Sequence, residues 1–171
     1  MKTKLMVFLG LTAGVLMLSS SLLAHHSNAI SDKDRLVTMT GTVTKFAFIN
    51  PHVGITFDTK DEHGTVQSWY TAGGSPMALH RDAGWTNTTI KLGEQILVQG
   101  HPNRDGRPLL LTMRLYRCTG EMIPLDNNKI EAGEYLTHVK MVPLDPAKVQ
   151  AVCAGKDKVP DQFSDLVKNK K

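Results

Sequence analysis

Five short segments with the residue pattern of β-strands lie between residues 36 and 117 of the chain. They are rich in β-branched and aromatic residues, alternate loosely between apolar and polar positions, and comprise residues 36–49, 53–59, 65–71, 95–100 and 109–117. Such alternation is typical of strands that bury one face. Asn50-Pro51 and a turn at residues 61–64 separate the first three segments, which predicts an antiparallel meander.

One helix start falls between the third and the fourth segment. Ser75 is a suitable N-cap, Pro76 fits the first helical position, and Gly84 is expected to end the helix. Three strands, a short helix and two strands is the order of an OB-type barrel. We therefore predict an all-β domain over residues 25–117, a five-stranded OB-like barrel with one short helix between strands 3 and 4.

Three details of the barrel are predicted from single positions. Gly41 is expected to mark a bulge or sharp bend in the first strand, because glycine inside a strand often does so. Trp85, which follows the helix, is expected to plug one end of the barrel. Alternation along the last strand predicts one shared face for Leu109, Leu111, Met113 and Leu115.

Residues 118–171 have a different pattern and form a C-terminal extension. Asp145-Pro146 repeats the cap-and-proline start, which predicts a short helix to about Ala154. The inner face of this helix is expected to carry Val149, Val152 and Cys153. Residues 134–142 are a candidate for a further strand, and a last helical turn is indicated by the spacing of Phe163, Leu166 and Val167.

The first 24 residues predict a cleaved signal peptide. Lys2 and Lys4 form a basic start, residues 6–18 are apolar, and small residues lead up to Ala24. The apolar run is shorter than the roughly 20 residues that span a bilayer. We therefore expect cleavage, after Ala24 or alternatively after Ala29, and a periplasmic or secreted protein without stable membrane insertion.

The two cysteines, Cys118 and Cys153, are predicted to form a disulfide. In an oxidising compartment such a pair most often does, and the bond would close a loop of 36 residues (153 − 118 + 1). Free thiols or one half of a metal site are the alternatives. The lack of a CxxC spacing favours the disulfide.

The charge balance argues against a nucleic-acid partner. Without Lys2 and Lys4, the 20 basic and 16 acidic residues become 18 and 16, a net charge of +2. Only 6% of the residues are aromatic. Proteins that bind single strands in an OB barrel use a basic groove with aromatic platforms, so we expect no nucleic acid here.

A combination of short motifs extends from His25 to Tyr116. The motifs are His25-His26-Ser27, Gly41-Thr42-Val43, Asn50-Pro51-His52, Trp69, Gly74-Ser75-Pro76, Leu79, Arg81, Gly84-Trp85, Gly93, Gly100 and Arg104-Asp105-Gly106. Together they resemble a family of small exported bacterial proteins that is catalogued as a domain of unknown function. The resemblance implies a periplasmic or secreted OB-like barrel and no particular activity.

The chain departs from this family at two places. Family members usually carry a glutamate two residues before the Gly-Ser-Pro motif, where this chain has Ala72. Any role of that carboxylate is therefore lost here. Residues 118–171 also lie outside the family pattern.

Two loop motifs, Asn50-Pro51-His52 and Gly74-Ser75-Pro76, are predicted to meet at one end of the barrel. Asn50 and His52 would then face a ligand, while Ser75 caps the helix or binds an anion at the helix N-terminus. The alternative is that turn chemistry alone fixes both loops, with Asn50 in an Asx-type turn.

His25 and His26 follow the predicted cleavage site and suggest copper as the one candidate cofactor. An N-terminal histidine can chelate a cupric ion through its α-amine and its imidazole. Cleavage one residue earlier would put a histidine third, where a square-planar site can form. His52 is the candidate further ligand. The alternative is an exposed histidine start, with His52 bonded to a neighbouring loop.

Three functions are compatible with this pattern. The first is a non-enzymatic binding module, with a small molecule, a metal ion or a partner protein as ligand and with Asn50, His52 and Ser75 at its site. The second is a copper-binding protein that uses His25, His26 and His52. The third is an enzyme, which we do not expect because the sequence contains no legible nucleophile–base pair or metal triad.

Overall fold

The computed structural model describes residues 30–125, 138–139, 141 and 143–164. The predicted signal peptide (residues 1–24) and the two histidines after it, His25 and His26, lie outside these residues. Most of the candidate strand at 134–142 also lies outside them. The fold described below belongs to one compact unit, Ser31–Lys171, which contains the extension and the predicted barrel domain from Ser31 on.

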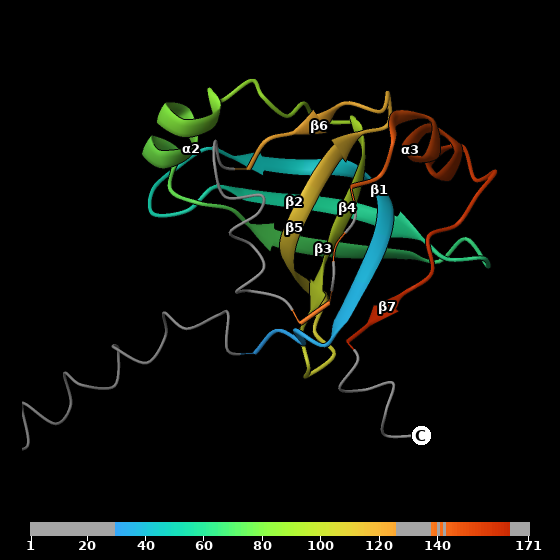
Figure 1. Ribbon diagram of the computed structural model, residues 1–171. Helices are drawn as coiled ribbons and strands as arrows, with labels where there is room; N and C mark the ends of the chain where they lie inside the picture. Colours follow the sequence, from blue (N-terminus) through green and yellow to red (C-terminus); the bar gives the residue numbers. More distant parts are fainter. Residues whose placement is uncertain (1–29, 126–137, 140, 142, 165–171) are drawn as a thin grey trace, which may run out of the picture. The chain divides into compact units, whose positions relative to one another are not determined.

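Five strands form a closed ring of hydrogen-bonded neighbours (Figure 1). They are β1 (Arg35–Ala47), β2 (Gly54–Lys60), β3 (Val66–Ala72), β4 (Gln95–Pro102) and β5 (Leu109–Arg117). The order is β2-β3-β5-β4-β1, and β1 pairs again with β2, which closes the ring. Of these pairs, β3–β5 is parallel and the others are antiparallel. With a helix between β3 and β4, this topology confirms the predicted OB-like, all-β architecture.

The helix between β3 and β4 is α2 (Pro76–Ala83), and it begins and ends as predicted. Ser75 Oγ accepts a hydrogen bond from the backbone N–H of Ala78 (3.2 Å), and Gly84 takes the left-handed conformation with φ 69°. Trp85 follows directly and belongs to the apolar core. Its indole N–H donates to the carbonyl of Pro124 (2.6 Å), which satisfies its polar atom inside the core.

The register irregularity in β1 lies at Thr44 and not at Gly41, so the bulge predicted at Gly41 is wrong, while the alternative of a bend there stays a prediction. The register against β2 shifts between Val43 and Lys45. Gly41 is in regular register, and a Cβ built on it would lie 2.7 Å from the carbonyl oxygen of Asp58. Glycine at this position allows the two strands to approach closely. From the sequence alone, a glycine that serves a close approach cannot be told from one that marks a bulge.

The predicted apolar face of β5 is also wrong. The register of β5 against β4 shifts at Met113, where β5 has one extra residue. Leu110 before this bulge and Leu115 after it both face the core, whereas Leu109 and Leu111 do not belong to it. An extra residue reverses the alternation of side chains, so a regular pattern cannot hold across the whole strand.

The described parts of the C-terminal extension pack on the outside of the ring. A two-residue strand, β6 (Met122–Ile123), pairs with β5, and α3 (Pro146–Cys153) begins at its N-cap Asp145 as predicted. Val149 of α3 is fully buried against Leu97 and Tyr116, with Val152 and Cys153 beside them. Burying a valine side chain in this way contributes about 1.5–3 kcal/mol.

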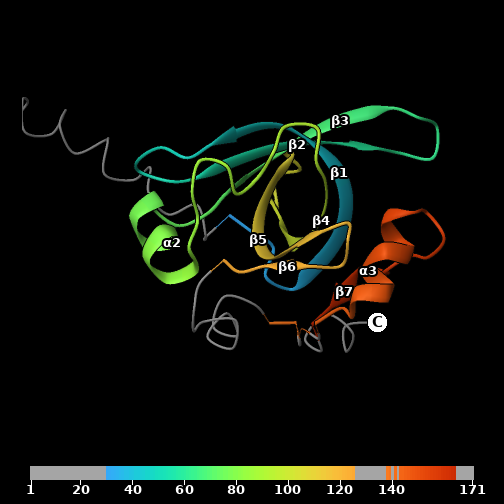
Figure 2. The same cartoon turned by 90° about the horizontal axis from the view of Figure 1, so that it is seen from above.

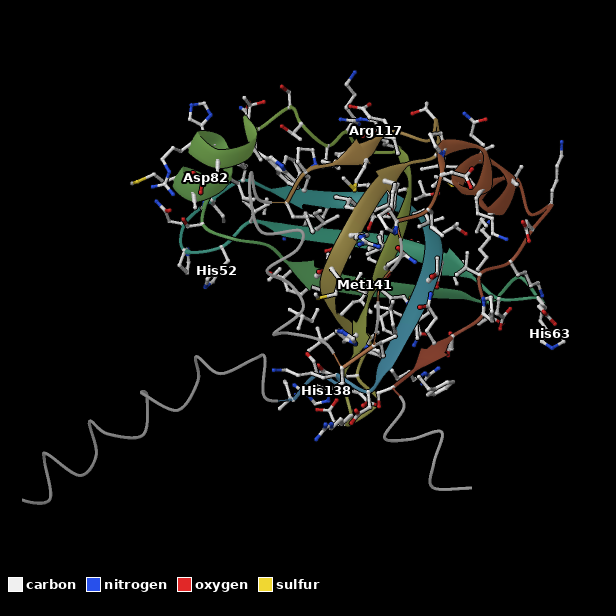
Figure 3. The ribbon with its side chains drawn as sticks, in the orientation of Figure 1. His52, His63, Asp82, Arg117, His138 and Met141 are labelled. Atoms are coloured by element: carbon white, nitrogen blue, oxygen red, sulfur yellow. A yellow bond between two sulfur atoms is a disulfide. The ribbon has the colours of Figure 1, made fainter. Side chains whose placement is uncertain are left out.

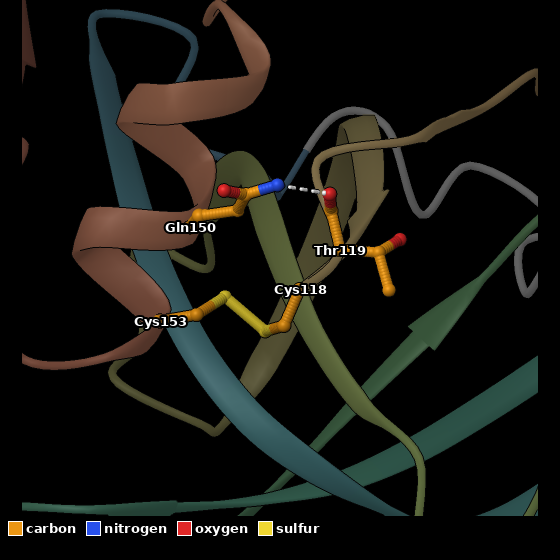
Figure 4. Close-up of a disulfide and its surroundings, with 4 residues drawn as sticks. All are labelled: Cys118, Thr119, Gln150 and Cys153. Atoms are coloured by element: carbon orange, nitrogen blue, oxygen red, sulfur yellow. Dashed lines mark hydrogen bonds between the residues drawn. A yellow bond between two sulfur atoms is a disulfide. The ribbon is translucent and has the colours of Figure 1, made fainter.

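A disulfide ties this helix to the barrel, as predicted. It joins Cys118, just after β5, to Cys153, the last residue of α3, with 5.6 Å between the two Cα atoms (Figure 4). Beside it, the side-chain amide of Gln150 donates to the carbonyl of Thr119 (2.6 Å). The end of β5 and the last turn of α3 are thus held together by a covalent bond and a hydrogen bond.

The chain after α3 returns to the beginning of β1. Gln162–Phe163 form β7, which pairs antiparallel with Arg35–Leu36. The predicted helical turn at Phe163 is therefore wrong, because strand pairing overrides a local helical spacing; Leu166 and Val167 lie outside the described residues. An ion pair between Lys158 and Glu62 (2.9 Å) also links this return to the β2–β3 hairpin.

Candidate functional site

The two loops predicted to meet do meet at one end of the ring. The backbone N–H of Val53 donates to the carbonyl of Gly74 (3.0 Å), and the N–H of Gly73 donates to the carbonyl of Val53 (2.7 Å). These bonds hold the loop of Asn50 and His52 against the turn before α2. The two loops are adjacent because the strand ends that carry them lie at the same edge of the ring. The order of the elements in the sequence already suggested this arrangement.

The side chains of this end are exposed. Asn50 and His52 are both on the surface, and Figure 3 shows His52 on the outside of its loop. Ser75 uses its hydroxyl as the N-cap of α2, so the capping role applies. The predicted site residues therefore share one end of the fold, and their binding role stays a prediction.

A groove lies on the outer face of β1 and β2, in the part of the chain that the structure describes. Seen from above, the turn of the β2–β3 hairpin and α3 both lie on the outer side of β1, apart from each other (Figure 2). The groove has a volume of about 370 Å³ and is lined by Thr40, Gly41, Thr42, Thr44, Asp58, Lys60, Val66, Gln95, Cys118 and Cys153. We call it the β1–β2 groove. Its volume lies within the roughly 300–1,000 Å³ typical of small-molecule sites.

The strand periodicity explains the polar lining of the β1–β2 groove. Val37 and Val43 face the core, so the threonines at alternate positions of β1 point outward. Asp58 lies opposite Thr42 on β2, and Lys60 is two residues further on the same face. The disulfide, together with α3, bounds the groove on the side away from the hairpin.

The charged residues of the groove differ in how they are held. Asp58 accepts a hydrogen bond from Ser68 Oγ of the neighbouring strand (2.5 Å). Among the described residues, neither Asp58 nor Lys60 takes part in a salt bridge. One carboxylate, one ammonium group and the threonine hydroxyls therefore line the same hollow.

Sequence reasoning missed this groove. The signal that could have pointed to it is the run Thr38 to Thr44, where threonine occupies every second position and so gives the strand one polar face. What makes that face concave is the position of the hairpin and of α3, and no local pattern in the sequence gives these positions.

Three histidines of the described chain are engaged in the fold. His80 Nδ1 lies 2.8 Å from the carbonyl of Trp85, and His101 Nδ1 lies 2.7 Å from the carbonyl of Arg35. Burial lowers the pKa of His101, and its Nε2 has no hydrogen-bond partner within the described ranges of the chain. His138 Nδ1 lies 2.9 Å from Asp34 Oδ1.

Asp34 links Ser164 and His138 of the extension to the start of the barrel. Its Oδ1 also accepts a hydrogen bond from Ser164 Oγ (2.7 Å). The hydrogen bonds from Ser164 and from His138 hold the pKa of Asp34 below its usual value of 3.8. The Asp34 carboxylate thus joins its own segment to two others that are far away in the sequence, those of His138 and Ser164.

The candidate copper site is only partly described. His25 and His26 lie outside the described residues, and His52 is exposed. In the part of the chain that the structure describes, no three His, Cys, Asp or Glu side chains are grouped so as to hold a metal ion. No helix in that part has the length and apolarity needed to cross a membrane.

These features define a small OB-like domain with a disulfide-tethered extension and a polar groove. Residues 13–111 match a family of unknown function (DUF6152), which is 99 of 171 residues (111 − 13 + 1), more than half of the chain. The protein belongs to this family, as the combination of motifs indicated. No curated protein matches the chain.

Proposed function

We propose that this protein is a non-enzymatic binding module of the periplasm or the extracellular space, which takes a small polar ligand in the β1–β2 groove. The observation that carries the proposal is the groove itself, with a volume of about 370 Å³ and polar side chains from β1, β2 and β4 around it. A concave site with a few converging polar groups is the usual form of a small-molecule site.

The disulfide supports the proposed compartment. Disulfides form and persist outside the reducing cytoplasm, and Cys118–Cys153 is part of the groove lining. The basic start and apolar run of residues 1–24 support export in the same way.

The test is an NMR titration of the ¹⁵N-labelled protein with a panel of amino acids, sugars and small organic acids. We expect one class to shift the backbone amides of Thr40, Thr42 and Lys60. A Thr42→Phe variant, which fills the groove, should lose this binding, and a His52→Ala variant should keep it.

The reverse pattern would overturn the groove as the site. Binding that is lost in His52→Ala and kept in Thr42→Phe would assign the ligand to the end with Asn50, His52 and Ser75. Turnover of a compound that depends on His52, without unfolding of the variant, would overturn the non-enzymatic assignment.

Copper binding by His25, His26 and His52 is a second proposal, supported by the sequence pattern and by the exposure of His52. Stoichiometric cupric binding, measured by visible absorption, should be abolished by His25→Ala and weakened by His52→Ala. Unchanged binding in His25→Ala would exclude the terminal-histidine site. His63→Ala is the matched control, because His63 lies exposed in the β2–β3 turn.

A further inference from the structure

The β1–β2 groove presents one negative and one positive group that do not neutralise each other. Asp58 and Lys60 stand two residues apart on β2. Residues i and i+2 of a strand point to the same face and lie about 6.7 Å apart along it. Asp58 accepts a hydrogen bond from Ser68. In the described part of the chain it forms no salt bridge with Lys60.

This spacing suits a ligand that carries both charges. A compact zwitterion can place its ammonium group on the free oxygen of Asp58 and its carboxylate on Lys60, so both charges gain a charge-assisted hydrogen bond. A ligand with only a negative charge would pair with Lys60 but be repelled by Asp58, and one with only a positive charge would pair with Asp58 but be repelled by Lys60, so each gains less than a zwitterion.

The rest of the groove fits the other parts of such a molecule. The hydroxyl groups of Thr40 and Thr42 and the amide of Gln95 can donate and accept hydrogen bonds. Val66 and the disulfide give the groove an apolar part that can contact an aliphatic side chain.

We propose that the groove binds a free aliphatic amino acid or a dipeptide, with the ligand ammonium at Asp58 and the ligand carboxylate at Lys60. This inference rests on the proposed function, that the groove is a ligand site.

The test uses four probes on the oxidised protein: L-leucine, N-acetyl-L-leucine, L-leucinamide and D-glucose. Affinity is measured by NMR titration of the groove amides. L-leucine should bind, while the acetylated and amidated probes, which each lack one charge, should bind at least about tenfold more weakly. Asp58→Asn and Lys60→Gln should each weaken L-leucine binding by about tenfold or more.

Two matched variants control for the loss of a charge as such. Lys45→Gln removes an exposed lysine of β1 that does not line the groove, and Glu121→Gln removes an exposed acid after β5. Both should leave the affinity for L-leucine unchanged. Equal loss in these controls would overturn the proposed contacts.

The outcomes separate the two proposals. N-acetyl-L-leucine or L-leucinamide binding as tightly as L-leucine would overturn the zwitterion inference. Binding of D-glucose alone, with shifts of the groove amides, would overturn the same inference and leave the groove as a ligand site. If no compound of this set or of the wider panel shifts a groove amide, both proposals are overturned.

Discussion

Removal of the Cys118–Cys153 disulfide should lower the unfolding temperature by a predictable amount. The two cysteines are 35 positions apart, so the bond closes a loop of 36 residues. The chain-entropy model gives −2.1 − 1.5R ln 36, or roughly −13 cal/mol/K, for the entropy that the bond removes from the unfolded chain. At 25 °C this corresponds to a loss of about 3.8 kcal/mol of unfolding free energy in Cys118→Ala/Cys153→Ala.

The size of the folded unit converts this free energy into a temperature. Ser31–Lys171 comprises 141 residues (171 − 30), and an unfolding entropy of about 2.1 cal/mol/K per residue gives roughly 0.3 kcal/mol/K for the whole unit. The double variant should therefore melt about 13 °C below the wild type. Because the bond acts mainly on the unfolded chain, and Val149 still packs on Leu97 and Tyr116, the far-ultraviolet circular dichroism at 25 °C should not change.

The assay is thermal unfolding followed by circular dichroism, with and without a reductant that cleaves the bond. Reduced wild type should melt close to the double variant, and the reductant should leave the double variant unchanged. A fall of less than about 3 °C would contradict the entropy argument. A loss of helical signal at 25 °C would show instead that packing alone does not hold α3.

Three further changes test single structural features. Gly41→Ala should cost about 1–3 kcal/mol in urea unfolding, because the added methyl group would lie 2.7 Å from Asp58 O; an unchanged midpoint would mean that the strands can move apart freely. Ser75→Ala should cost about 1 kcal/mol through loss of the N-cap of α2, and Ser75→Asp should retain stability; equal stability of both variants would refute the capping role. Burial lowers the pKa of His101 below 6.5, so the unfolded chain binds a proton at a higher pH than the folded protein does, and stability should fall as the pH drops through 6.5. The change in unfolding midpoint between pH 7 and pH 5 should shrink in His101→Gln and persist in His63→Gln; equal pH dependence in all three proteins would exclude His101 as its source.

The sequence by itself determined the order and the kind of the elements. Ser75 and Asp145 each precede a proline, and both are N-caps, because capping depends on groups within three residues of one another. Five strand patterns with a helix between the third and the fourth permit few compact arrangements, and the closed ring is one that leaves fewer free strand edges than an open sheet.

The sequence also predicted that the two loops of the candidate site lie together. The Asn50–His52 loop and the turn before Ser75 are adjacent, as the order of strands suggested. The exposure of His52 depends on how far its loop projects from the ring, which a local motif does not encode.

Only the tertiary structure decided which side chains face the core and where the surface is hollow. The extra residues at Thr44 and Met113 reverse the alternation of side chains, and their positions depend on which residues of the neighbouring strand they pair with. Phe163 joins a strand because the start of β1 has a free edge beside it. The β1–β2 groove arises because the β2–β3 hairpin and α3 both project on the outer side of β1, and these elements are far apart in the sequence. Its charges at Asp58 and Lys60 are visible in the sequence, but their shared hollow results from contacts between distant segments.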